Sequence, residues 1–240
     1  MGQVGNALKS TLKGEIVQTY DTEYGFSDKK SLEGIPPTIL HICFPWSEDF
    51  IDDAITYINL LTPEYIIIHS TVPVGTTDQI SLSVDAPVMH SPIVGQHDNL
   101  SKGVDTFEKW IGGNNMKATR YVAKYLNKFM NMKVKSSSEV TELAKLLATY
   151  RFGLAIARAQ EEKRLCDMVG VEFKEVVTDF IEMYNRGYKK LGMKWAIQPN
   201  TFPGKIGGHC VMQNLDLLEK LSTGLIFPKA IRKSNENQPD

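Results

Sequence analysis

The sequence predicts an α/β protein in which a doubly wound parallel sheet is followed by an all-α region that begins with one long helix. Two observations support this prediction. From Gly2 to about Val134, short apolar runs alternate with stretches of helical periodicity, as expected for a parallel sheet covered by helices. After Ser136 the pattern changes to long helices.

Five apolar runs in the first part are bounded by Gly, Pro, Asp or Asn, as strand ends tend to be. The predicted strands are residues 15–20, 38–44, 65–70, 86–90 and 107–111. A helix is predicted over residues 47–61, because Ser47 is an N-cap candidate, acidic residues follow it, and Pro63 ends the helix.

The second part is predicted to be helical. A long helix covers Ser138–Val169, and Gly170 ends it. Its apolar side chains at helical spacing are Leu143, Leu147, Tyr150, Leu154 and Ala157. A second helix over 173–191, a Gly- and Pro-rich stretch over 192–208 and a short helix over 211–221 follow. The polar tail after Pro228 is expected to be disordered, so we expect three parts, residues 1–136, 137–225 and 226–240.

The composition of the chain excludes some classes of binding partner. The chain has 240 residues and a formal net charge of -1, which offers no basic field to nucleic acid or to an anionic membrane. No apolar run approaches the ~20 residues that span a bilayer, and the start lacks the apolar stretch of a signal peptide. The three cysteines do not form a disulfide framework. We therefore expect a cytoplasmic protein whose partner is a small polar ligand.

The first residues, MGQVGNALKS, match the latter part of the dinucleotide fingerprint G-x-G-x-x-G of Rossmann-like folds, with Gly2 and Gly5 as its last two glycines. The backbone of Gly2, Gln3 and Val4 would meet the cofactor pyrophosphate at a helix N-terminus. Asp21, 19 residues after Gly2, would accept hydrogen bonds from the ribose hydroxyls, which favours NAD over NADP. The first strand of such a domain would precede Gly2, so a truncated or depleted domain is expected. The alternative is that the two glycines form only a flexible start.

Two later segments are more specific. Residues 69–77, HSTVPVGTT, leave a strand through a Pro–Gly turn into a helix, and residues 206–210 read IGGHC. They closely resemble the S-T-V-P-x-G-T and G-G-H-C segments of the UDP-glucose/GDP-mannose, or nucleotide-sugar, 6-dehydrogenase family. The segments ELAK, EEKRLCDMVG, ICFP and WIGG also resemble segments of that family. The resemblance spans nearly the whole chain but leaves no room for the family's third domain after Leu221.

The resemblance implies roles for individual residues. The cofactor would also be bordered by Phe44, Pro45, Ser70 and Thr71. Thr71 would lie beside the reacting sugar as well. In the family, an alcohol carbon of a nucleotide sugar is oxidised twice, through an aldehyde, to a carboxylate, and a hydride passes to NAD each time. Cys210 would trap the aldehyde as a thiohemiacetal, which becomes a thioester that water hydrolyses.

Lys145 is implied to stabilise the oxyanion charge that develops in this chemistry. An ordinary surface lysine on a charged helix is the alternative. His209, beside the catalytic cysteine, has no assigned role. Cys43 and Cys166 are expected to lie in the core, because free cysteines are commonly buried and inert.

Four positions depart from the family pattern. Thr149 replaces an Asn, Asn214 replaces an Asp, Ile93 replaces a Glu, and Lys205 replaces a Gly. Thr149 and Asn214 stay catalytic candidates because both keep hydrogen-bonding groups, but Asn214 cannot act as a base. Removing one general acid or base commonly costs about two to four orders of magnitude in rate. A chain that stops at the aldehyde would be consistent with this pattern.

Three other functions compete with this one. One is a non-catalytic nucleotide-binding relic of the family. Another is a short dehydrogenase that acts on a smaller hydroxy acid through Lys145 and has no room for a nucleotide. A metal hydrolase using His90, His97, His209 and Cys210 is formally open, although the spacings match no zinc motif.

One face of the long helix is more apolar than a single small domain should require, and in the family this helix forms a dimer interface. We therefore expect a homodimer through residues near Leu143 to Ala157.

Overall fold

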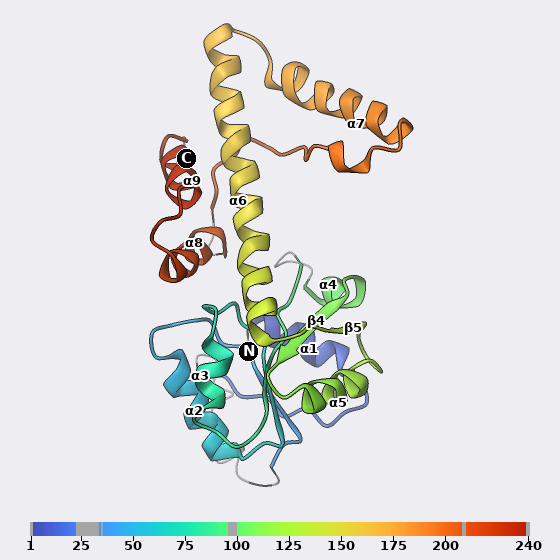
Figure 1. The fold of residues 1–240 in the computed structure, drawn as a ribbon, viewed down its shortest axis with the longest axis vertical. Helices are drawn as coiled ribbons and strands as arrows, with labels where there is room; N and C mark the ends of the chain where they lie inside the picture. The colour runs from blue at the N-terminus through green and yellow to red at the C-terminus, as the bar shows by residue number, and fades with distance from the viewer. Residues whose placement is uncertain (1, 23–33, 35, 96–99, 208–209, 239–240) are drawn as a thin grey trace. The chain divides into compact units, whose positions relative to one another are not determined.

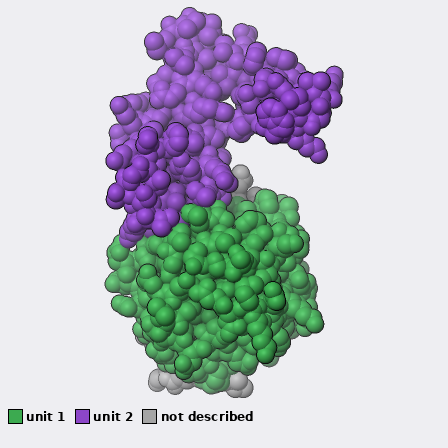
Figure 2. Space-filling view, viewed as in Figure 1, with its two compact units in different colours: residues 1–145 green, residues 146–240 purple. Residues whose placement is uncertain are grey.

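The computed structural model describes residues 2–22, 34, 36–95, 100–207 and 210–238. They fall into two compact units, Met1–Lys145 (unit 1) and Leu146–Asp240 (unit 2), coloured separately in Figure 2. Helix α6, Ser138–Val169, contains the boundary between the two units.

Unit 1 is built on a five-stranded sheet with the order β1-β2-β3-β4-β5. The strands are β1 (Ile39–Ile42), β2 (Tyr65–Ile68), β3 (Val88–His90), β4 (Lys109–Gly113) and β5 (Met132–Val134). All neighbouring strands are parallel except β3 and β4, which are antiparallel. The α/β fold and four of the five predicted strands are confirmed. The prediction of a wholly parallel sheet is wrong at β4, because apolar periodicity carries no information on strand direction.

Helices cover both faces of this sheet (Figure 1). The elements on one face are α1 (Gln3–Thr11), α4 (Leu100–Thr106) and α5 (Met116–Leu126); those on the other are α2 (Phe50–Leu61) and α3 (Thr76–Ser81). In β2, Ile67 packs with the first set, whereas Ile66 and Ile68 pack with the second. Burial on both faces explains why this strand is apolar at every position.

Residues 15–20, predicted as a strand, do not form one. Side chains anchor the segment instead: Val17 packs against the core that includes α1, and the rings of Tyr20 and Tyr57 lie 5.5 Å apart between centroids. Ile16 is 98% exposed. The prediction was wrong because apolar β-rich composition does not supply a pairing partner, and β1 pairs only with β2 among the described residues.

Unit 2 is entirely helical in the part of it that the structure describes. After α6 come η3 (Lys174–Asp179, a π-helix), α7 (Phe180–Lys190), η4 (Lys194–Ala196), α8 (Cys210–Leu221) and α9 (Phe227–Glu236). Ile156 of α6, Leu215 of α8 and Ile231 of α9 form the centre of its main core. Among the described residues, no helix combines the length and apolar character needed to cross a bilayer.

The C-terminal region forms helix α9, so the expectation of a disordered tail after Pro228 is wrong. Pro228 lies in the first turn of α9, where the missing N–H of proline costs no intrahelical hydrogen bond. Ile231 is fully buried, and Arg232 Nη2 lies 2.5 Å from Asp216 Oδ1 and 3.1 Å from Glu219 Oε2 of α8. The expectation was wrong because it relied on average polarity, whereas two of the polar residues, Ser234 and Asn235, are buried and hydrogen-bonded to Gln160 of α6 and to the Ile206 N–H.

Candidate functional site

Several predicted cofactor-binding residues meet at the carboxyl ends of β1 and β2. Phe44 and Pro45 follow β1, and Ser70 and Thr71 follow β2. Ser70 Oγ donates a hydrogen bond to the Phe44 carbonyl at 2.5 Å, which ties the two strand ends together. In open α/β sheets, ligands bind in the crevice outside the carboxyl ends of the strands. The structure therefore brings these four residues to an edge where a cofactor would be expected.

The turn that follows Thr71 is held by a buried carboxylate from α6. Gly75 has a φ of 93° and precedes α3. Glu142 accepts hydrogen bonds from the Gly75 N–H at 2.7 Å, the Thr77 N–H at 2.9 Å and the Thr77 hydroxyl at 2.6 Å. Burial raises the pKa of Glu142, while these hydrogen bonds lower it. Glu142 thus fixes the turn by satisfying the amides at the start of α3.

We expect Glu142→Gln to lower the free energy of unfolding of unit 1 by about 2 kcal/mol, since one amide N–H of glutamine would face a backbone donor. Chemical denaturation followed by far-UV circular dichroism measures the change. The matched control is Glu64→Gln in the same unit, because Glu64 is exposed. Equal stabilities of the two variants would contradict the proposed role of Glu142.

Lys145 lies on the same turn of α6 as Glu142. Its Nζ donates to the Ile93 carbonyl at 2.8 Å, so the ammonium group is directed at the loop after β3. Ile93 is 5% exposed and belongs to the core that includes α1. The position where the resemblance implies a glutamate therefore serves packing in this chain, and only its carbonyl oxygen contacts Lys145.

A row of buried polar side chains crosses the same edge of the sheet, and the sequence analysis missed it. His69 Nδ1 lies 2.7 Å from the Ser91 carbonyl, and Lys109 Nζ donates to the same oxygen at 2.7 Å. His41 Nδ1 lies 2.9 Å from His69 Nε2. Since a carbonyl only accepts, neutral His69 carries its proton on Nδ1 and accepts from His41 on Nε2.

Burial dominates the titration of this row. It lowers the pKa of His41 to about 4 and that of Lys109 to about 7. Histidines in two consecutive predicted strands, His41 and His69, are the signal that could have revealed part of the row. Among the described residues no group of three or more His, Cys, Asp or Glu side chains could hold a metal ion, and His97 and His209 lie outside those residues.

Helix α1 offers part of a dinucleotide site. Gly2 is its N-cap with extended backbone, and a Cβ placed there would meet no atom within 4 Å. Gln3 and Val4 begin the helix, and the N–H groups of a first helical turn point out of its N-terminal end. Asp21 is half-buried at the end of the extended segment 15–20. The direction of these amides fits a bound phosphate.

The remaining catalytic candidates belong to unit 2. Cys210 is the first residue of α8 and is exposed. Asn214 lies one turn later and donates through Nδ2 to Thr149 Oγ1 at 2.9 Å, while Thr149 donates to the Leu146 carbonyl at 2.9 Å. The two substituted positions therefore bond each other as a neutral pair. Gly208 and His209 lie outside the described residues, and Lys205 is exposed.

A glycine of α6 positions the start of α8. A Cβ built on Gly153 would lie 2.6 Å from Cγ1 of Val211, the neighbour of Cys210. Val211 is buried in the core that α6, α8 and α9 share. This close approach fixes the backbone next to the exposed thiol.

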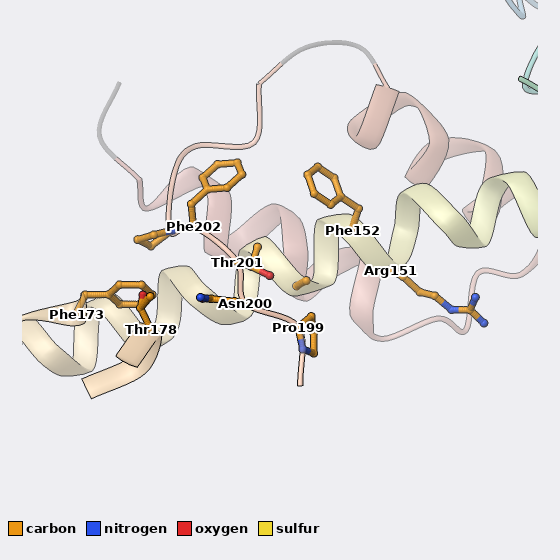
Figure 3. Close-up of a pocket in the computed structure, with 10 residues that line it drawn as sticks. Arg151, Phe152, Phe173, Thr178, Pro199, Asn200, Thr201 and Phe202 are labelled. Carbon is orange, nitrogen blue, oxygen red and sulfur yellow. The ribbon is translucent and has the colours of Figure 1, made fainter. Parts of the chain in front are cut away.

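Unit 2 also contains an open cavity of about 860 Å³. Figure 3 shows its lining, formed by Arg151, Phe152, Ala155, Phe173, Thr178, Pro199, Asn200, Thr201, Phe202 and Pro203. None of the predicted catalytic residues lines it. The cavity is therefore not part of the predicted site.

The chain is similar in sequence to known dehydrogenases. No protein-family model matches the chain. Curated UDP-N-acetyl-D-mannosamine dehydrogenases of Methanococcus maripaludis and Methanococcus vannielii are each 28% identical over 178 residues. These matches cover 72% of this chain and 39% of each relative, so the chain spans about two fifths of their length.

Solved structures share the fold. A UDP-D-ManNAc dehydrogenase from Pyrococcus horikoshii has a TM-score of 0.67 at 24% identity, covering 83% of this chain and 50% of that chain. A 3-hydroxyisobutyrate dehydrogenase from Mycobacterium tuberculosis has a TM-score of 0.66 at 13% identity, covering 98% of this chain and 87% of that chain. The chain is thus similar in sequence to UDP-N-acetyl-D-mannosamine dehydrogenases, and it shares its fold with solved dehydrogenase structures.

Proposed function

We propose that the chain is the cofactor-binding and central part of an NAD-dependent oxidoreductase that oxidises a CH–OH group of a nucleotide sugar in the cytoplasm. The observation that carries the proposal is the similarity to UDP-N-acetyl-D-mannosamine dehydrogenases over 178 residues. UDP-N-acetyl-D-mannosamine is therefore the first substrate to test.

NAD would lie along the carboxyl edge of the sheet of unit 1. Its pyrophosphate would contact the start of α1, and Asp21 would accept hydrogen bonds from the ribose hydroxyls. Phe44, Pro45, Ser70 and Thr71 would border the rest of the cofactor. Bound NAD supplies the acceptor for the hydride that leaves the sugar carbon.

The protein side chains would handle the proton and the aldehyde. Lys145 would place positive charge near the alcohol oxygen as its proton leaves. The thiolate of Cys210 would attack the aldehyde carbon, forming a C–S bond while the carbonyl electrons move to oxygen. Loss of hydride from that carbon to a second NAD would restore the carbonyl and leave a thioester. Asn214 cannot take a proton from the water that hydrolyses a thioester. We therefore propose that carboxylate formation is slow and that the thioester on Cys210 accumulates.

Calorimetric titration with NAD tests the cofactor site. We expect the whole chain to bind NAD, and Asp21→Ala to weaken binding by roughly 10- to 100-fold, because charge-assisted hydrogen bonds contribute about 1.5–3 kcal/mol. Asp105→Ala is the control, since Asp105 is exposed on α4. Absence of binding would rule out an oxidoreductase formed by this chain alone.

Product analysis with NAD and UDP-N-acetyl-D-mannosamine then tests Cys210. Cys210→Ala should abolish the remaining carboxylate product without changing NAD affinity. Equal carboxylate yields from the two proteins would remove Cys210 from the mechanism.

A second candidate activity is oxidation of a smaller hydroxy acid through Lys145. The match to the 3-hydroxyisobutyrate dehydrogenase favours it, because that match covers 98% of this chain and 87% of that chain. Reduction of NAD with 3-hydroxyisobutyrate, but not with a nucleotide sugar, would identify this activity. NAD or nucleotide-sugar binding without turnover of either substrate would identify a non-catalytic relic.

We also propose that the chain forms a homodimer. The contact surface needs revision, because Tyr150, Leu154 and Ala157 pack against the core that α6 forms with α8 and α9. Most of the apolar face expected to bind a second copy is thus covered within unit 2.

A further inference from the structure

Lys109, the first residue of β4, is buried although its side chain ends in an amine: it is 4% exposed. Its partner across the sheet, Met132 of β5, is apolar and belongs to the core that includes α1. Burying an amine costs free energy that an apolar side chain at the same position would not cost. Packing alone therefore does not account for a lysine here, and buried titratable groups of this kind are concentrated at functional sites.

The amine of Lys109 binds the segment that leaves β3, residues 91–93, which we call the β3 exit. Its Nζ donates to the Ser91 carbonyl at 2.7 Å and to the Pro92 carbonyl at 3.1 Å. Ser91 Oγ donates in turn to the Trp110 carbonyl of β4 at 2.8 Å. Because β4 runs antiparallel to β3, its first residues lie beside the chain that leaves the end of β3. The start of β4 therefore holds the first two residues of the β3 exit.

The third residue of the β3 exit binds Lys145 of α6. Lys145 Nζ donates to the Ile93 carbonyl at 2.8 Å, so two lysines bind three consecutive carbonyl groups. Pro92 lies between the two contacts, and its ring restricts rotation about φ. A shift of the segment at Lys109 would thus displace the carbonyl that binds Lys145.

The described part of the chain offers Lys109 no carboxylate as a partner. Burial lowers the pKa of Lys109 to about 7; Cys43 opposes this shift, and the charge of Lys145 adds to it. The charge of Lys109 also reaches three histidines whose pKa values burial lowers, namely His41, His69 and His90. The carbonyl groups of the β3 exit are therefore the groups that stabilise the buried amine, and the amine stabilises the β3 exit in return.

We propose that Lys109 is a positioning residue for the oxidation: it fixes the β3 exit and, through the Ile93 carbonyl, the amine of Lys145. The inference rests on the proposed function, in which Lys145 places positive charge near the alcohol oxygen. Lys109 acts only through Lys145. Displacement of a catalytic group by about 1 Å can cost roughly 100-fold in rate, so an anchor of this kind affects turnover strongly.

The chemical reactivity of Lys145 in the full chain tests the positioning without any need for turnover. Trace acetylation with isotopically labelled acetic anhydride, followed by complete acetylation of the denatured protein and mass spectrometry of its peptides, measures this reactivity relative to that of exposed Lys117. At pH 9 Lys109 is neutral, since its pKa is about 7, so a change of charge does not contribute to the comparison. Lys109→Met should raise the reactivity of Lys145 by about 3- to 10-fold, the factor that corresponds to loss of one hydrogen bond.

Met132→Ala is the matched control, because Met132 is buried beside Lys109 in the sheet but belongs to the apolar core. It should lower the thermal stability of unit 1 and leave the reactivity of Lys145 unchanged. With NAD and UDP-N-acetyl-D-mannosamine, Lys109→Met should lower kcat by about 10- to 100-fold, with the KM for the sugar and the NAD affinity unchanged. Met132→Ala should change none of these kinetic values at a temperature well below its unfolding.

Unchanged reactivity of Lys145 in Lys109→Met, or an equal rise in Met132→Ala, overturns the inference. A rise in reactivity without a fall in kcat overturns it as well, because the contact would then have no effect on the reaction. A chain that binds NAD but turns over no substrate overturns the proposed function instead, and the acetylation still decides whether Lys109 fixes Lys145.

Discussion

Replacing Gly112 by alanine is expected to destabilise unit 1 by at least about 3 kcal/mol, at the upper end of the cost of overpacking a rigid site. A Cβ on Gly112 would lie 2.0 Å from the Ser137 carbonyl oxygen and 2.6 Å from its carbonyl carbon. Both atoms are backbone, so a rotamer change cannot relieve the overlap. The chain that crosses β4 on its way to α6 therefore explains the first glycine of WIGG, whereas a Cβ on the second, Gly113, would lie 2.9 Å from the Val88 carbonyl oxygen of β3.

Neither side of this contact can move freely. Gly112 pairs with His90 in the sheet, and Ser138, the first residue of α6, is fully buried. Any shift of α6 would also disturb Glu142 and Lys145, which hold the loops after β2 and β3.

Urea unfolding followed by tryptophan fluorescence measures the effect of Gly112→Ala, in a chain whose Trp195 is replaced by phenylalanine so that the signal comes from Trp46 and Trp110 of unit 1. Gly34→Ala in the same unit is the control, because a Cβ there meets no atom within 4 Å. Its midpoint should equal that of the unchanged protein. A Gly112→Ala protein with the same midpoint as this control would show that Ser137 does not cross β4 at this distance.

The comparison of sequence and structure shows which features depend on local pattern. The strand at residues 65–70 was predictable because an apolar β-branched run between turn residues has few other structures open to it. The strand at 15–20 was not, because its formation depends on a neighbour. Likewise, the antiparallel direction of β4 follows from the path between β3 and α6, which no local periodicity records.

The candidate site also combines features that a local pattern predicts with features that only the fold reveals. The interval of four residues between Cys210 and Asn214 places both on one side of a helix, and the motif alone predicts this. The hydrogen bond from Asn214 to Thr149 joins residues 65 positions apart in the sequence, so only the fold reveals that the two substitutions are paired. Lys109 gives no sequence signal at all, since most lysines are exposed.

The stability of unit 1 is expected to fall by several kcal/mol between pH 7 and pH 5, because the fold holds three histidines in neutral form: His69 and His90 are buried, and His41 is half-buried. Burial lowers the pKa of His41 to about 4 and that of His90 to about 3, and it lowers the pKa of His69 well below the usual value. Nearby Lys109 lowers all three further, and Lys145 adds to the effect at His90.

The direction follows from which state binds more protons. Above the unfolded value of about 6.5, both states are neutral and the full stability is present. As the pH falls from about 6.5 toward the lower pKa values of the folded state, the unfolded chain binds protons that the folded chain does not bind. The free energy of unfolding therefore decreases. Each histidine then costs about 1.4 kcal/mol per pH unit, and the loss ends below the folded pKa. Glu142, whose pKa burial raises, opposes this trend at lower pH.

Thermal unfolding of the full chain with Trp195 replaced by phenylalanine, followed by tryptophan fluorescence from pH 7 to pH 5, measures this loss of stability. His90→Gln is the informative variant, because a glutamine amide can donate to the Ser70 carbonyl and accept from Thr141 as His90 does, yet it does not titrate. Its stability should fall less steeply with decreasing pH than that of the unchanged protein. Unit 2, whose only histidine is His209, provides the internal reference. Parallel pH profiles for His90→Gln and the unchanged protein would mean that His90 is already charged in the fold, and its bonds to Ser70 and Thr141 would then need both ring nitrogens as donors.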